Sequence, residues 1–266
     1  MCPLQSFYSL DNFGTVNKLR ANVQKCQWTV SSEHFKNAPT KDVMCIEKFE
    51  GANGFDRLRD MRLIQSDSFF ESGIQRINFN QDKEMTGIID VSTINKFIVA
   101  AMRSPSSNEE LDLYISKDGK NWHEAVFPQG QKMVERSYTL LESNDHSLMV
   151  NVLSNSVALY GDLFKSNSNG TFYAQSLEYV NRNFEGIVDF ERIQGLEGIM
   201  LANIQSSPSD MLSGKEKKVQ SRISFDDGAT WASLTKVKNE DGNDMKCDNV
   251  SKLKGKHLVF NLGHAH

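Results

Sequence analysis

The chain has 266 residues, 39% of them hydrophobic, which is enough to bury the core of one large domain or two small ones. Its formal net charge of -4 argues against nucleic acid as a partner. No apolar run approaches the ~20 residues that span a bilayer, and Met1–Leu10 lacks the pattern of a signal peptide. The sequence therefore predicts neither a membrane span nor a secretory signal in this chain.

Short strands separated by turn residues are the predicted elements, and helical periodicity is nearly absent. Asn17–Asn22 is the segment for which we expect a helical turn. Alternating residues predict strands at Leu111–Ile115 and Val219–Ile223. Continuous apolar runs predict strands covered on both faces at Thr86–Val91, Phe97–Met102, Ser147–Val152 and Gly198–Ile204. Many short strands with frequent turns are typical of a sandwich, a barrel or a propeller.

A short cassette recurs between predicted strands, which indicates a repeat architecture. Its two clear copies are Ser116–Trp122 and Ser224–Trp231. Ser166–Phe172 is a degenerate copy with Ser for Asp and Phe for Trp, and Ser9–Val16 is a weaker copy. The residues that define the clear copies are Ser116, Asp118, Gly119 and Trp122, and Ser224, Asp226, Gly228 and Trp231.

The residue types of the cassette predict a hairpin turn. An Asp carboxylate accepts hydrogen bonds from backbone N–H groups of the turn, and Gly takes a positive φ without strain. The Ser hydroxyl ties the strand end to the turn, and Trp buries a large apolar surface under the hairpin. Because each Asp is explained by its own turn, we predict a structural role for Asp118 and Asp226 and no catalytic residues.

The cassette is the Asp box found in sialidases and in sortilin-type sorting receptors, and longer stretches resemble the second family. These stretches are Phe7–Phe13, Ser137–Ser143, Leu163–Thr171, Gly186–Phe190 and Gly195–Asn203. Over nearly its whole length the chain resembles the fungal vacuolar protein-sorting receptors of the sortilin family.

The resemblance implies an all-β fold: about four four-stranded blades of a ten-bladed β-propeller, as an incomplete ring. We expect residues 1–266 to form this partial propeller domain, with the cassettes at 9–16, 116–122, 166–172 and 224–231 on outer turns of successive blades. The wide gap between the first two cassettes is expected to hold an insertion that carries Cys26 and Cys45. Residues 252–266 are predicted to be a divergent C-terminal tail.

The family's function implies protein or propeptide cargo, such as the vacuolar hydrolase carboxypeptidase Y. Members of the family carry cargo from the late Golgi to the endosome and are placed in Golgi and late endosome membranes, with this region in the lumen. The resemblance therefore implies the cargo-binding part of a sorting receptor and no enzyme activity. It implies no cofactor.

Cysteines and sequons add three expectations. None of the four cysteines forms a CxxC pair, so the sequence offers no zinc site. Cys26 and Cys45 could be buried thiols or close a short disulfide loop, and the resemblance implies the disulfide, whereas Cys247 has no obvious partner. The sequons at Asn169 and Asn249 are candidate N-glycosylation sites.

Two other interpretations of the sequence stay open. The alternative function is an Asp-box sialidase-like glycoside hydrolase, which needs a cluster of arginines and an acid–base pair. Arg57, Arg59 and Arg62 crowd one segment, and no such constellation is evident. The chain could also be a truncated copy without a function of its own.

His264 and His266 form an H-x-H pattern without a third ligand nearby, so we predict a frayed tail and no metal site.

Overall fold

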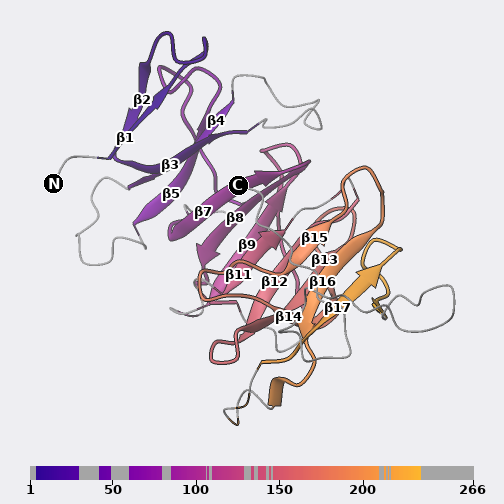
Figure 1. The fold of residues 1–266 in the computed structure, drawn as a ribbon. Helices are drawn as coiled ribbons and strands as arrows, with labels where there is room; N and C mark the ends of the chain where they lie inside the picture. Colours follow the sequence, from indigo (N-terminus) through magenta and orange to yellow (C-terminus); the bar gives the residue numbers. More distant parts are fainter. Residues whose placement is uncertain are drawn as a thin grey trace, which may run out of the picture. The chain divides into compact units, whose positions relative to one another are not determined.

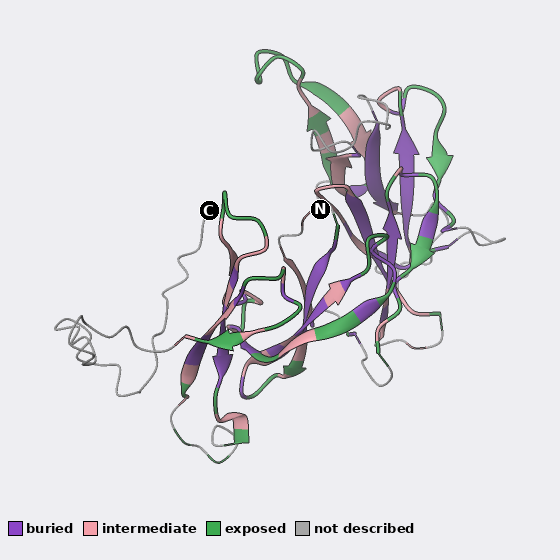
Figure 2. Ribbon diagram, turned by 90° about the vertical axis from the view of Figure 1, so that its right-hand side faces the viewer, coloured by how far each residue is buried: buried purple, intermediate pink, exposed green. Residues whose placement is uncertain are grey.

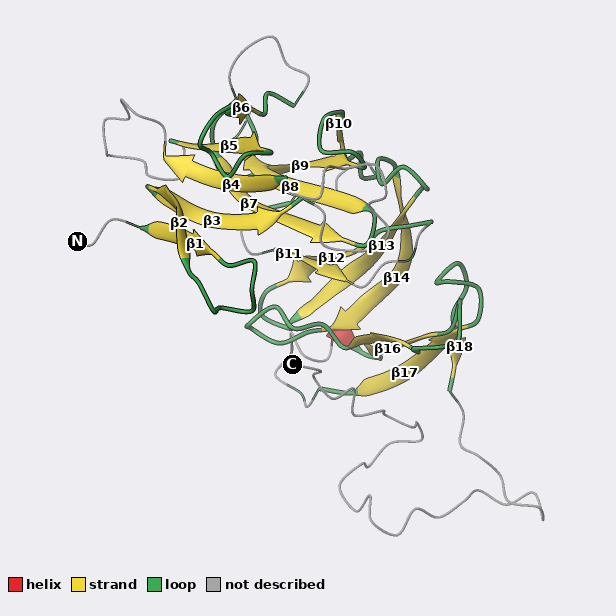
Figure 3. Cartoon of the chain, turned by 90° about the horizontal axis from the view of Figure 1, so that it is seen from above, coloured by secondary structure: helices red, strands yellow, loops and turns green. Residues whose placement is uncertain are grey.

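The computed structural model describes most of the chain as antiparallel strands joined by turns (Figures 1 and 3). The described residues are 4–29, 42–48, 60–79, 85–105, 107, 110–128, 133–134, 137–141, 144, 146–209, 213, 215 and 217–234. They belong to two compact units, each with its own core. Unit 1 comprises Met1–Glu135, Ser143–Leu148 and Ser166–Tyr173, and unit 2 comprises Arg136–Glu142, Met149–Lys165 and Ala174–His266.

Unit 1 contains one hairpin and two sheets whose four strands follow one another in chain order. The hairpin is β1 (Gln5–Tyr8) and β2 (Asn17–Ala21). The first sheet is β3 (Val23–Trp28), β4 (Val43–Lys48), β5 (Met61–Ser66) and β6 (Gln75–Arg76). The second sheet is β7 (Ile88–Ile94), β8 (Phe97–Arg103), β9 (Leu111–Ser116) and β10 (Trp122–Glu124).

Unit 2 repeats this arrangement. One sheet consists of β11 (Tyr138–Leu141), β12 (Met149–Asn155), β13 (Tyr160–Ser166) and β14 (Tyr173–Asn181). The next consists of β15 (Phe190–Arg192), β16 (Met200–Gln205), β17 (Val219–Ser224) and β18 (Ala232–Ser233). A single residue pair, Val180 with Ile204, joins the two ladders. Since four consecutive antiparallel strands form the blade of a propeller, the fold is all-β with four such blades among the described residues.

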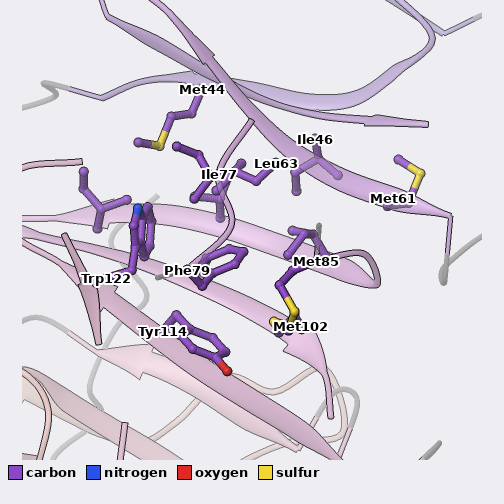
Figure 4. Packing of buried hydrophobic residues seen from close by; sticks show 14 residues of the cluster. Met44, Ile46, Met61, Leu63, Ile77, Phe79, Met85, Met102, Tyr114 and Trp122 are labelled. Carbon is purple, nitrogen blue, oxygen red and sulfur yellow. The ribbon is translucent and has the colours of Figure 1, made fainter. Parts of the chain in front are cut away.

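The core of unit 1 lies between its two sheets. Apolar side chains of β4 and β5 meet those of β7, β8 and β9, and Figure 4 shows Phe79 beside Trp122 and Tyr114. The ring centroid of Phe79 lies 5.1 Å from that of Trp122 and 4.8 Å from that of Tyr114. β8 is buried along nearly its whole length, as its continuous apolar run predicts. Figure 2 shows the buried stretches of the strands in purple.

Two expectations about the first part of the chain are wrong. Asn17–Asn22 forms no helical turn, because Asn17–Ala21 is strand β2 and pairs with β1. The pairing with β1 across this hairpin sets the extended conformation of the segment. The gap between the first two cassettes holds no simple insertion either, because it contains the complete sheet β3–β6, with Cys26 on β3 and Cys45 on β4.

Candidate functional site

The cassette Ser224–Trp231 forms the turn between β17 and β18. The Ser224 hydroxyl donates to Asp226 Oδ1 at 2.8 Å and accepts from the backbone N–H of Gly228 at 2.8 Å. Asp226 also accepts bonds from the hydroxyl and the N–H of Thr230. The bonds from Thr230 and Ser224 lower the pKa of Asp226 to about 2. The carboxylate is therefore occupied by its own turn.

The cassette Ser116–Trp122 has the same pattern between β9 and β10. The N–H of Gly119 donates to Ser116 Oγ at 2.9 Å, and Asp118 Oδ1 accepts the N–H groups of Lys120 and Asn121 at 2.8 Å each. Burial raises the pKa of Asp118, but the bonds from Asn121 and Lys120 outweigh burial and lower it. Trp122 is 2% exposed, so the returning strand buries its indole, whereas Trp231 is half-buried.

The weak copy Ser9–Val16 makes the same hydrogen bonds between β1 and β2. Ser9 Oγ accepts the N–H of Phe13, and Asp11 accepts the N–H and hydroxyl of Thr15, each at 2.8 Å. Phe13 takes the place that Gly228 has in the last cassette, with φ 67°. A left-handed φ is uncommon for a residue that has a side chain. The hydrogen bonds of the turn therefore hold the backbone of Phe13 in this conformation without a glycine.

The structure reveals a further cassette that the sequence reading missed, in the turn between β5 and β6. Ser66 Oγ accepts the N–H of Phe70 at 3.0 Å, and Ser68 Oγ accepts the N–H of Ser72 at 3.3 Å. Ser68 replaces the Asp, and Phe70 replaces the Gly with φ 64°. The signal that could have found it is the spacing of oxygen-bearing residues at i, i+2 and i+6, which Ser9, Asp11 and Thr15 share with Ser224, Asp226 and Thr230.

The degenerate copy Ser166–Phe172 differs from its prediction in two respects. Asn167, and not Ser168, supplies the acceptor: its Oδ1 accepts the N–H of Thr171 at 2.9 Å. Phe172 does not replace the buried Trp, because it is 63% exposed. The next residue, Tyr173, is 7% exposed instead and stacks on Phe127 with ring centroids 4.2 Å apart.

Glycines of the cassettes lie close to a neighbouring sheet of the same unit. A Cβ at Gly119 would lie 3.1 Å from Thr29 and 3.2 Å from Met44. A Cβ at Gly170 would lie 2.8 Å from Ile115. A Cβ at Gly228 would lie 2.7 Å from Met149 in unit 2. At these three positions an added side chain would crowd the neighbouring sheet, and glycine also takes the positive φ without strain.

A disulfide joins Cys26 and Cys45 across the ladder of β3 and β4, with an S–S distance of 2.07 Å.

Asn169, the asparagine of the first sequon, is exposed, and its Oδ1 accepts a hydrogen bond from Lys117 Nζ at 3.0 Å. Asn249, Cys247 and the expected tail at 252–266 lie outside the described residues.

The arginine segment considered for a hydrolase is only partly described. Arg57 and Arg59 lie outside the described residues, and Arg62 pairs with the buried carboxylate of Glu47 at 2.6 Å. Within the described ranges, no group of three or more His, Cys, Asp or Glu side chains could hold a metal ion. The described part of the chain also contains no helix with the length and hydrophobicity to cross a membrane.

A groove of ≈ 770 Å³ lies in unit 2 beside β11, the edge strand of its sheet. Tyr138, Thr139 and Leu141 form one side, and the connection from β14 to β15 forms the other, with Phe184 83% exposed. The Thr139 hydroxyl donates to the carbonyl of Gly186 at 2.8 Å and so attaches this connection to the strand.

Arg182 is among the residues that line the groove and is 3% exposed. Its Nη1 donates to the carbonyl of Ser137 at 3.2 Å and to Asn151 Oδ1 at 3.1 Å. Burial lowers the pKa of Arg182. The groove therefore combines an exposed aromatic ring, a strand edge and a buried cation. The sequence reading missed it, because its sides come from segments about 45 residues apart.

The comparisons with known proteins identify a family. The family model Sortilin-Vps10, described as sortilin, neurotensin receptor 3, matches residues 1–261. A protein of Aspergillus oryzae named vacuolar protein sorting/targeting protein 10 is 37% identical over 97% of this chain and 17% of its own length. A protein of the same name from Pyrenophora teres f. teres is 35% identical, again over 97% of this chain and 17% of its own length. The chain thus spans less than a fifth of these relatives.

Solved structures show weaker similarity. A Trypanosoma rangeli sialidase in complex with sialic acid is 14% identical with a TM-score of 0.39, over 88% of this chain and 45% of that one. A xyloglucanase from Xanthomonas campestris is 14% identical with a TM-score of 0.37, over 76% of this chain and 29% of that one. Neither likeness bears on function. On the family model and the relatives at 35–37% identity, the chain belongs to the Sortilin-Vps10 family.

Proposed function

We propose that the chain is a cargo-binding part of a sorting receptor for vacuolar hydrolases such as carboxypeptidase Y. In this role it lies on the luminal side of the Golgi and the endosome and binds propeptides or peptide tails. Family membership and the names of the relatives support the proposal. Residues 1–266 are then one stretch of a sortilin-type propeller, with 252–266 as its divergent end.

The observation that carries the proposal is the groove beside β11. An edge strand offers backbone N–H and C=O groups to an extended peptide, which adds to the sheet as a further strand. β11 pairs with β12 on one side, and among the described residues no strand pairs with its other side. Backbone pairing of this kind supplies affinity with little dependence on the cargo sequence.

The register between β11 and β12 indicates which backbone groups of β11 point away from β12 and are open to an added strand. The N–H of Leu153 donates to the carbonyl of Ser137, so this pair exchanges the ladder bonds. Hydrogen-bonded and non-bonded pairs alternate along an antiparallel ladder. The pair of Leu140 with Val150 is therefore of the non-bonded kind, and the backbone N–H and C=O of Leu140 point away from β12.

Side chains around the groove supply specificity in this proposal. Phe184 offers an exposed aromatic face to an apolar cargo residue, because large rings contribute much of the binding energy at protein interfaces. Arg182 offers a positive charge to a carboxylate or a carbonyl of the peptide. Alternate side chains of an added strand would point toward these two groups.

Binding of a synthetic carboxypeptidase Y propeptide, measured by calorimetry against a scrambled peptide, tests the proposal. Leu140→Pro removes the N–H that points away from β12 but breaks no hydrogen bond to β12. This variant should therefore no longer bind the propeptide. Leu140→Val keeps the N–H and serves as the matched control. Circular dichroism should confirm that both variants keep the fold. Equal affinity for the propeptide and the scrambled peptide would contradict cargo recognition.

In this proposal the chain has no enzyme activity. The carboxylates of the cassettes are engaged by their own turns, and the described Arg62 is paired with Glu47. Turnover of a fluorogenic sialoside by the purified chain, lost on changing one buried carboxylate, would support a glycoside hydrolase instead. A folded chain that neither turns over a glycoside nor retains any propeptide would support the interpretation as a copy without a function of its own.

A further inference from the structure

We propose that Asn169 carries an N-linked oligosaccharide whose first sugar lies over the polar hollow between two successive cassettes. The inference rests on the proposed luminal location. The sequon Asn169-Gly170-Thr171 lies in the turn between β13 and β14, and Asn169 is exposed there. This position is an exposed hairpin tip, where a bulky substituent meets no core.

The hydrogen bonds of Asn169 leave its reactive atom accessible. Its Oδ1 accepts from Lys117 Nζ at 3.0 Å, and no hydrogen bond among the described residues uses its Nδ2. An N-glycan attaches at Nδ2 and leaves the carbonyl oxygen unchanged. The bond from Lys117 therefore persists after modification and orients the linkage amide. Asn167, two residues earlier, differs because its Nδ2 donates to Thr171 Oγ1 at 3.2 Å.

The transfer needs a glycosyl donor of the polyprenyl-pyrophosphate class. The Nδ2 atom forms a bond to C1 of the first N-acetylglucosamine, the bond from C1 to the pyrophosphate oxygen breaks, and Nδ2 loses one proton. The polyprenyl pyrophosphate leaves with the electron pair, so no redox partner is needed. In the folded chain Thr171 is only 9% exposed. The sequon must therefore be used before the turn closes.

The hollow beside Asn169 suits the base of a glycan. It measures ≈ 340 Å³, and its lining consists of one apolar residue, Ile115, and six polar ones: Lys117, Asp118, Asn121, His123, Asn169 and Thr171. That size falls within the ~300–1,000 Å³ of small-molecule sites. The lining offers amine, amide, imidazole and carboxylate groups to sugar hydroxyls and the acetamido group. All of these residues belong to unit 1.

Expression in yeast behind a secretory leader tests site occupancy. Treatment of the purified chain with an amidase that releases N-glycans should convert Asn169 to Asp, detected by peptide mass spectrometry. Asn169→Gln should lose one glycan from the intact mass, and Asn121→Gln, on the same hollow, should lose none. The Cys26–Cys45 disulfide reports entry into the oxidising lumen. A chain with this disulfide and an unmodified Asn169 would overturn the proposal.

The position of the first sugar has its own test. An endoglycosidase should release the glycan from the folded Lys117→Ala chain about twofold faster or more than from the native chain. The reason is that the variant loses one hydrogen bond at the linkage. Lys120→Ala, on the same turn but outside the hollow, should leave the rate unchanged. Equal rates for the two variants would show that the hollow does not hold the glycan. Neither experiment uses cargo, so a failure here and a failure of propeptide binding are distinguishable.

Discussion

Two side chains of different charge act as acceptors in turns of the same kind. Asp226 accepts the N–H of Thr230 at 2.8 Å with a carboxylate, and Asn167 accepts the N–H of Thr171 at 2.9 Å with an amide oxygen. Ser68 does the same with a hydroxyl toward Ser72. These turns thus share an oxygen acceptor four residues before the donor, and a negative charge is not common to them.

The first prediction compares two variants of Asp226. Asp226→Ala should lower the midpoint of thermal unfolding, because the donors of Thr230 lose their partner. Asp226→Asn should lower it less, because an amide oxygen can accept the same N–H, as Asn167 does. Differential scanning calorimetry at neutral pH measures both. An Asn variant as unstable as the Ala variant would show that the turn requires the charge.

The second prediction concerns pH. The folded pKa of Asp226 is depressed to about 2 from its ordinary value of 3.8. A depressed pKa stabilises the folded state above the unfolded pKa, and this contribution disappears as the pH falls from about 4 through about 2. Unfolding midpoints of the native chain should therefore fall further over this window than those of Asp226→Asn. A carboxyl titration followed by NMR would locate the folded pKa directly, and a midpoint near 4 would contradict the prediction.

The third prediction separates the two tryptophans of the cassettes. Trp122 is 2% exposed and contacts Phe79, whereas Trp231 is half-buried and donates its Nε1–H to Ser176 Oγ at 3.0 Å. Trp122→Ala should lower the free energy of unfolding by ~3–5 kcal/mol, and Trp231→Ala should lower it by less. Urea denaturation of each variant measures the difference. A larger loss of unfolding free energy for Trp231→Ala than for Trp122→Ala would mean that burial does not determine which tryptophan contributes more to stability.

At the scale of elements, each described cassette lies between the third and fourth strands of a blade, or in the β1–β2 hairpin. In such a turn, hydrogen bonds shape the backbone, and a glycine allows close approach to a neighbouring sheet. Gly119 approaches Met44 across the core of unit 1, and Gly228 approaches Met149 in unit 2. The cassettes thus contribute to packing between sheets as well as to the hairpins themselves.

The fourth prediction separates packing from backbone strain at Gly170. Its φ is 77°, and an added Cβ would lie 2.8 Å from Ile115 and 3.0 Å from Phe97. Gly195 has nearly the same φ, 80°, with nothing within 4 Å. Gly195→Ala should cost ~1–2 kcal/mol for the left-handed backbone alone. Gly170→Ala should cost that amount plus ~1–3 kcal/mol for overpacking. Equal losses of unfolding free energy would mean that the neighbouring side chains move aside.

At the scale of the molecule, one covalent link and one buried ion cluster tie the first elements together. The disulfide joins β3 to β4, and Glu47 on β4 pairs with Arg20 on β2 at 2.7 Å and with Arg62 on β5. Glu47 is 4% exposed, so removal of its carboxylate would leave buried positive charge. These contacts join the β1–β2 hairpin to the sheet that follows it.

The fifth prediction concerns the redox compartment. Replacing Cys26 and Cys45 with alanine should lower the free energy of unfolding by ~2–4 kcal/mol, since the crosslink closes a loop with a sequence separation of 19. The native chain prepared under reducing conditions should have the same free energy of unfolding as the variant, and the oxidised native chain should have a higher one than both. Denaturant titration with and without reductant measures this. Indistinguishable curves would mean that the disulfide adds no stability.

The sequence alone predicted six of the strands and the two clear cassettes, because both are local patterns. Leu111–Ser116 and Val219–Ser224 are strands as their alternation predicts, and Ser224–Trp231 carries turn chemistry within eight residues. The cassette at Ser66–Ser72 was not recognised, because Ser and Phe replace the Asp and Gly that mark the others. Hydroxyl acceptors form the same bonds, but they are too common in sequences to stand out.

The all-β fold class and the family were determined by the sequence itself, since alternation and turn residues act over a few positions and the family-like stretches extend along the chain. Tertiary structure alone decided which of Phe172 and Tyr173 is buried, because burial depends on the segment that stacks on the ring. It also decided that Thr139 and Arg182 meet at one groove, because contacts between distant segments exist only after the strands pair.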